Sequence, residues 1–171
     1  MTGSFIENLS EILIGRTAFL GMGNVDRGDD GAGMALAQKL LESGISNVFL
    51  GGTNPEKNLP SIRDGGYDTV FLLDAAHMGA EPGSIAILDA REIQSTFPVV
   101  STHKISAGML ARLITEGNRT SVWLIGIQPE TIAMGRIGLG PIVEKTVTYA
   151  AQGIEKLMAL QVVRPQELVC I

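Results

Sequence analysis

Apolar residues in this chain form two kinds of pattern. Short, compact apolar runs bounded by glycine or polar residues, typical of buried strands, occur at 17–22, 47–50, 69–74, 84–88 and 121–127. Apolar residues at helical spacing occur at 4–14, 33–41, 56–64, 105–114 and 141–157. Buried strands that alternate with helices predict the α/β class, with a mostly parallel sheet covered by helices on both faces.

The spacing of the third and fourth predicted strands favours one antiparallel strand. Only about ten residues, including Gly79, Pro82 and Gly83, separate the strand ending at Asp74 from the strand at 84–88. A parallel crossover needs about a dozen residues or more, so the connection is predicted to be a hairpin. The expected fold is a three-layer αβα sandwich around a twisted sheet of about five strands.

The length of the chain predicts a single domain spanning residues 1–171. With 171 residues and 45% hydrophobic composition, it can bury one sizeable core. Residues 1–16 are expected to be an N-terminal extension containing a short helix, and residues 160–171 a loose tail.

Charge and cysteine content narrow the classes of partner and the compartment. The net charge of -5 and the lack of any basic run disfavour nucleic acid. No apolar run approaches the roughly 18 residues of a membrane span, so no membrane insertion is expected. The start of the chain lacks the charge pattern of a secretory signal, and Cys170 is the only cysteine. We therefore expect a cytoplasmic protein.

The glycine-rich loop after the first predicted strand, residues 21–31, could bind a ligand. It resembles a dinucleotide fingerprint, but the third glycine of G-x-G-x-x-G would fall on Asp26. Asp29 and Asp30 stand at the start of the following helix, where two carboxylates would repel a pyrophosphate and favour a cation. The competing interpretation, left open by the sequence, is that either aspartate only caps the helix.

Two other predicted loops carry side chains that can bind metal. Asp74 ends a buried strand, and in open α/β sheets such strand ends face the ligand crevice. His103 precedes a predicted helix, and together with Asp30 and Asp74 it would supply an oxygen-oxygen-nitrogen set suited to a borderline divalent ion. Asp74 could instead form a turn, and His103 could be a surface or capping residue. His77 is the rival imidazole ligand.

Motifs of other hydrolases are absent from the sequence. It contains no H-E-x-x-H and no G-x-S-x-G, and Cys170 has no residues set around it to activate a thiol. If the protein cuts peptides, metal-assisted attack by water is the remaining route.

Several short motifs together give the chain a strong family resemblance. The sequence resembles the [NiFe] hydrogenase maturation endopeptidases, in particular the branch that serves formate-hydrogenlyase and related hydrogenases. The matching pieces occur in the family's order over roughly residues 17–158: Gly21-Met22-Gly23-Asn24, Gly28-Asp29-Asp30-Gly31, Gly51-Gly52-Thr53, Leu73-Asp74-Ala75-Ala76-His77-Met78-Gly79, Pro82-Gly83, Ser101-Thr102-His103 and Gly126-Ile127-Gln128-Pro129.

The resemblance implies an activity and a partner. Such a protease recognises nickel in the precursor of a hydrogenase large subunit and then removes the C-terminal extension of that precursor. Ni²⁺ would arrive with the substrate, although other divalent ions could occupy the site. Two other functions stay open: a nucleotide-binding module using the glycine-rich loop, and a maturation chaperone that does not cleave.

The resemblance also implies roles for particular residues. Asp30, Asp74 and His103 would bind the metal, for catalysis, for recognition or for both, in an aspartic-type or metal-assisted endopeptidase. Gly51, Gly52 and Thr53 would contact substrate. Asp29 and His77 would lie behind the ligands or at the rim. One departure is Leu50, which stands where many relatives carry an acidic residue.

Overall fold

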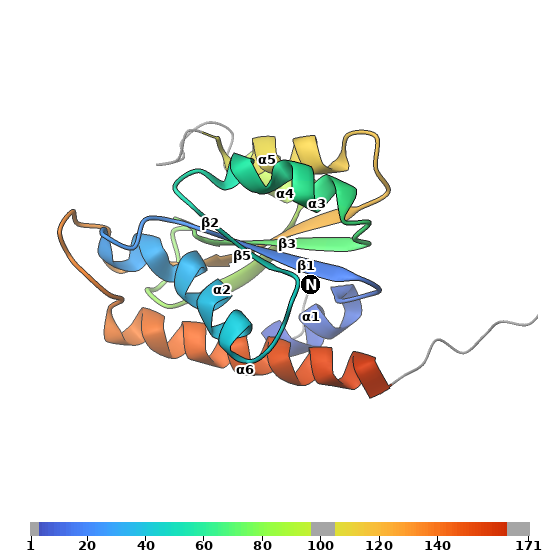
Figure 1. The fold of residues 1–171 in the computed structure, drawn as a ribbon. Helices are drawn as coiled ribbons and strands as arrows, with labels where there is room; N and C mark the ends of the chain where they lie inside the picture. Colours follow the sequence, from blue (N-terminus) through green and yellow to red (C-terminus); the bar gives the residue numbers. More distant parts are fainter. Residues whose placement is uncertain (1–3, 97–104, 164–171) are drawn as a thin grey trace, which may run out of the picture.

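The computed structural model describes residues 4–96 and 105–163 and shows a five-stranded sheet between two layers of helices (Figure 1). The sheet order is β2-β1-β3-β5-β4. All neighbours are parallel except β4 and β5, so the predicted mixed α/β fold is confirmed. The elements are α1 (Phe5–Ile12), β1 (Thr17–Met22), η1 (Gly28–Gly31), α2 (Ala32–Glu42), β2 (Val48–Gly52), η2 (Pro55–Asn58), α3 (Leu59–Asp64), β3 (Thr69–Ala75), β4 (Ile85–Asp89), α4 (Ala90–Thr96), α5 (Ala107–Thr115), β5 (Ser121–Ile127) and α6 (Pro141–Val163).

The two central strands are apolar on both faces because each face is covered by helices. Every residue of β1 is buried. On one face Phe19 stacks on Phe71 of β3, with ring centroids 5.5 Å apart, beneath α1, α2 and α6. On the other face Leu20 and Leu72 pack with side chains of α3, α4 and α5. Figure 1 shows these two helical layers on opposite sides of the sheet.

The predicted hairpin between β3 and β4 is wrong, although β4 is antiparallel as expected. β4 pairs with β5, and β5 lies between β4 and β3. The segment after β3 therefore passes beyond the position of β5 before the chain turns back. Backbone bonds between that segment and the residue after β5 stabilise the crossing: Gly83 N–H donates to Gln128 O, and Gln128 N–H donates to Ser84 O.

Helical structure extends further at two places than the sequence predicted. α4 was not predicted, and its Ile93 is fully buried. α6 continues to Val163, so the predicted loose tail is wrong for residues 160–163, while 164–171 lie outside the described residues. The short helix predicted in the N-terminal extension is confirmed as α1, which begins at a capping box between Ser4 and Glu7 and buries Leu9 against α6 and the sheet.

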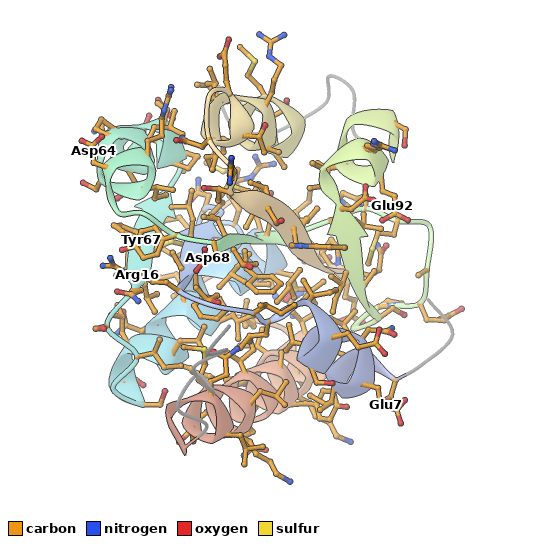
Figure 2. All side chains as sticks on the ribbon, turned by 90° about the vertical axis from the view of Figure 1, so that its right-hand side faces the viewer. Glu7, Arg16, Asp64, Tyr67, Asp68 and Glu92 are labelled. Atoms are coloured by element: carbon orange, nitrogen blue, oxygen red, sulfur yellow. The ribbon has the colours of Figure 1, made fainter. Side chains whose placement is uncertain are left out.

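At the amino end of the sheet, the connection from α1 into β1 is fixed to the segment before β3. Arg16 N–H donates to Asp68 Oδ2 over 2.7 Å, and the Arg16 guanidinium lies 5.0 Å from the ring centre of Tyr67. Figure 2 shows these three residues together at this edge, with Asp64 on α3 beyond them. These contacts secure the edge opposite the predicted ligand loops.

Among the described residues, no helix has both the length and the apolar character to cross a lipid bilayer.

Candidate functional site

The candidate site lies at the carboxyl edge of β1 and β3. β1 leads through α2 on one face to β2, and β2 leads through α3 on the other face to β3, so β1 and β3 are neighbours at the switch point of the sheet. Ligands of open α/β sheets bind in the crevice at such a point. α2 begins very close to this edge, because a Cβ on Gly33 would collide with the carbonyl oxygen of Leu73.

Asp30 lies in the turn η1, directly after the loop that leaves β1. Its side chain is 4% exposed, and its Oδ2 accepts a hydrogen bond from Asn24 N–H at 3.2 Å. η1 packs against β3, so the turn that carries Asp30 lies beside the strand that carries Asp74. Neither Asp30 nor Asp29 supplies a side-chain cap to α2, whose N-cap residue is Gly31, so the capping interpretation does not hold.

Asp74 is the penultimate residue of β3 and faces the same edge. In register it lies opposite Gly126 of β5, which has no side chain to cover it. The carboxylate is partly exposed, and its Oδ1 accepts from the N–H of Ala75 at 2.9 Å. The predicted placement of an acidic side chain at the open end of a buried strand is therefore confirmed.

Asp29 is an internal anchor and does not lie at the rim. It is 1% exposed and accepts three backbone hydrogen bonds: Oδ2 from Glu130 and Thr131 at 2.9 and 3.0 Å, and Oδ1 from Gly140 at 2.6 Å. Three N–H donors satisfy a buried carboxylate well, since such bonds to a charged acceptor are the stronger kind. Asp29 thus joins the loop after β1 to the connection between β5 and α6.

Backbone bonds reinforce this attachment along the same two segments. Gly28 N–H donates to Arg136 O at 2.6 Å, and Asp29 N–H donates to Thr131 O at 3.0 Å. Gly135 N–H donates to Asp26 O at 3.0 Å. Figure 1 shows the orange β5–α6 connection beside the blue segment between β1 and α2 at the left of the molecule. We name residues 130–140 the latched loop.

Gln128 ties the segment after β3 to the same region. Its side chain is 7% exposed, its Oε1 accepts from Met78 N–H at 2.8 Å, and its Nε2 donates to Pro129 O at 3.2 Å. The exposed His77 precedes Met78, so Gln128 helps to position the backbone of the rival imidazole ligand. An exposed position agrees with the rim role expected for His77.

Replacing Gln128 with leucine should loosen this connection. The Met78 N–H would lose its acceptor, and an unsatisfied buried donor costs about 1–3 kcal/mol. For a chain of this size we expect the melting temperature to fall by roughly 2–10 °C, measured by differential scanning calorimetry. Gln161→Leu, on the last turns of α6, is a poor control for this variant because the Gln161 side chain donates a part-buried hydrogen bond to Leu13 O. Gln38→Leu is the better control: Gln38 is exposed on α2 and loses only a solvent-exposed bond to Glu42 Oε1, so the melting temperature should change little.

Gly51, Gly52 and Thr53 lie on the neighbouring strand at the same edge. Gly52 pairs with Met22 at the end of β1, and its carbonyl accepts from Gly23 N–H at 3.1 Å. Its φ of +56° favours glycine, and the turn leaves Thr53 exposed. Thr53 is thus accessible from solvent, and the expected substrate contact of these three residues stays a prediction.

His103 lies in the segment 97–104, outside the described residues. Within the described part of the chain, no three histidine, cysteine, aspartate or glutamate side chains form a group that could hold a metal ion. Of the predicted set, Asp30 and Asp74 lie in two elements that pack together, η1 and β3, and their role as metal ligands stays a prediction. Two carboxylates there suit a cation better than a phosphate.

Comparisons with known proteins agree with the fold and with the resemblance. Residues 33–157 match the family model described as HycI, hydrogenase maturation protease, and this match begins after Asp30. The chain is similar to the hydrogenase 3 maturation protease of Escherichia coli K12, at 35% identity over 113 residues, which is 65% of this chain and 71% of the relative.

Solved structures extend the likeness over most of the chain. A [NiFe] hydrogenase maturation protease, HycI from Thermococcus kodakarensis KOD1, superposes with a TM-score of 0.79 at 27% identity, covering 89% of this chain and 99% of its own. The endopeptidase HycI from Escherichia coli gives a TM-score of 0.73 at 29% identity, covering 84% and 92%.

Proposed function

Because this chain belongs to the hydrogenase maturation protease family, we propose that it is the endopeptidase that removes the C-terminal extension of a [NiFe] hydrogenase large-subunit precursor. The observation that supports the proposal is the family match together with the packing of η1, which carries Asp30, against β3, which carries Asp74. Relatives named as hydrogenase maturation proteases support the substrate class.

Nickel enters this proposal as part of the substrate. Asp30 in η1 and Asp74 at the end of β3 would supply carboxylate oxygens, and His103 would add an imidazole nitrogen. Three protein ligands leave coordination positions open, so the ion can remain bound to substrate thiolates while the protease also binds it. Recognition is therefore the first role we assign to these three residues.

The same arrangement offers a route to peptide cleavage. A divalent ion held beside the scissile bond can polarise its carbonyl or a bound water. The rigid elements at the edge, β3 and the turn η1, hold the two carboxylates in fixed positions. Gly51, Gly52 and Thr53 lie where the extended substrate chain could pass along the end of β2.

Time-resolved mass analysis of the precursor tests the proposal. Mixed with this protein, the nickel-loaded precursor should lose one C-terminal peptide, and the nickel-free precursor should stay intact. A stable complex without cleavage would show a maturation chaperone instead. Tight binding of a nucleotide, with no effect of metal and no cleavage, would favour the nucleotide-binding alternative.

Asp30→Asn should weaken recognition of nickel while leaving the fold intact. The amide oxygen can still accept from Asn24 N–H, but the ion loses an anionic ligand. We expect KM for the nickel-loaded precursor to rise by about 10- to 100-fold, the range seen when groups that support a metal site are removed. Steady-state cleavage kinetics measure this change, and an unchanged KM with an unchanged melting temperature would remove Asp30 from the site.

A further inference from the structure

The tip of the latched loop presents two large apolar side chains to solvent beside the candidate site. Met134 is 74% exposed and Ile137 is 88% exposed, and every residue from 133 to 138 is exposed. Single exposed apolar residues are common on protein surfaces. What distinguishes this tip is the way in which the loop is held.

The latched loop is fixed to the segment that carries Asp30. Its carbonyl at Arg136 accepts from Gly28 N–H, and its N–H groups at Glu130, Thr131 and Gly140 converge on the buried Asp29. A buried carboxylate thus orders a loop whose tip contacts solvent. Such prior ordering lowers the entropy cost when a partner binds to the tip.

Positive charge lies next to the apolar tip. Arg27 and Arg136 form a parallel bridge between the first loop and the latched loop, and the side chain of Arg136 passes over Gly28. The Nε of Arg27 is buried and has no hydrogen-bond partner among the described residues. Arg27 and Arg136 thus bring two guanidinium groups to this part of the surface, where they could pair with a carboxylate of a partner.

We propose that the latched loop is the docking arm for the protein substrate: Met134 and Ile137 contact an apolar segment of the precursor, and Arg27 and Arg136 pair with a carboxylate beside it. This inference rests on the proposed function. The substrate is favoured over a second copy of this chain because the arm is hydrogen-bonded to Asp29, which is the neighbour of Asp30 in the sequence. A partner at the tip is therefore placed beside the crevice.

The test compares two surface variants in the cleavage assay. The double variant Met134→Ser/Ile137→Ser should raise KM for the nickel-loaded precursor by about tenfold or more, with kcat within about twofold, as expected for exposed interface anchors. Ile14→Ser, at the amino end of the sheet and 64% exposed, is the matched control and should leave KM unchanged. Both variants change exposed side chains, so their melting temperatures should match that of the wild type.

A charge variant tests the second part of the arm. Arg136→Glu should also raise KM, and the difference from wild type should shrink at high salt because exposed charges are screened. A salt-independent effect, or none, would remove the arginine from the docking arm.

Each remaining outcome supports or overturns the inference. An unchanged KM in the double variant overturns the docking arm while leaving the protease function intact. If the wild type fails to cleave, the proposed function fails, and calorimetric titration with the precursor then tests whether the docking arm binds it. Equal affinity of the wild type and the double variant for the precursor would overturn the docking arm. Loss of a wild-type dimer in the double variant, with KM unchanged, would assign the tip to self-association instead.

Discussion

Asp74→Ala should lower kcat/KM for precursor cleavage by about 100-fold or more, since removal of a ligand should cost at least as much as removal of a supporting group. Asp74 is partly exposed at the end of β3 and opposite a glycine, so truncation opens no core cavity. Its Oδ1 accepts a hydrogen bond from the adjacent N–H of Ala75. We therefore expect the melting temperature to change by no more than about 4 °C, the shift for roughly 1 kcal/mol in a chain of this size.

A matched carboxylate elsewhere tests whether this loss is specific. Asp64→Ala, on exposed α3, removes the same group far from the crevice and should leave cleavage unchanged (Figure 2). Cleavage by Asp74→Ala at the wild-type rate would show that the end of β3 does not take part in the site. Equal loss in both variants would point to an effect of net charge.

Asp29→Asn should destabilise the protein more than Asp30→Asn does. An amide has one carbonyl oxygen, so at least one of the N–H groups of Glu130, Thr131 and Gly140 would face an NH₂ group in a buried position. Loss of a buried bond to a charged acceptor costs about 1.5–3 kcal/mol, so the melting temperature should fall by roughly 3–12 °C. Release of the latched loop should also raise KM in the cleavage assay.

Asp26→Asn provides the neighbouring control. The Asp26 side chain is exposed, and the bond of this residue to the latched loop uses its backbone carbonyl, which the substitution retains. Calorimetry should show no change for Asp26→Asn. If Asp29→Asn were as stable as wild type, the three bonds to its carboxylate would not be holding the latched loop.

The strands could be predicted from the sequence because a buried strand requires a short run of apolar residues, which is visible in the sequence itself. β1 and β5 were predicted with their observed ends, since each is a compact apolar run between polar or glycine residues. α4 leaves no comparable pattern in the sequence: among its side chains whose burial the structure describes, Ile93 alone is fully buried. The partner of β4 was missed because pairing depends on where β5 inserts, and nothing in the local sequence of β4 encodes that position.

The positions of candidate residues could be predicted where the end of a strand determines them. They could not be predicted where backbone groups far away in the sequence determine them. The positions of Asp30 and Asp74 follow from the rule that ligands bind at the carboxyl edge of such a sheet. Asp29 differs from Asp30 only through bonds to residues 101 to 111 positions away, and the donors are backbone N–H groups present at almost every residue. The motif Gln128-Pro129 marked this region in the sequence, but its hydrogen bonds to Met78 and Pro129 became visible only in the fold.

The central claim is that Asp30, Asp74 and His103 bind one nickel ion together. Anomalous diffraction at the nickel edge, from crystals of this protein with Ni²⁺, tests it directly. The account predicts one peak at about 2.0–2.2 Å from a carboxylate oxygen of each aspartate and from a ring nitrogen of His103, by analogy with other divalent ions on such ligands. A peak bound elsewhere, or no peak between Asp30 and Asp74, would contradict it.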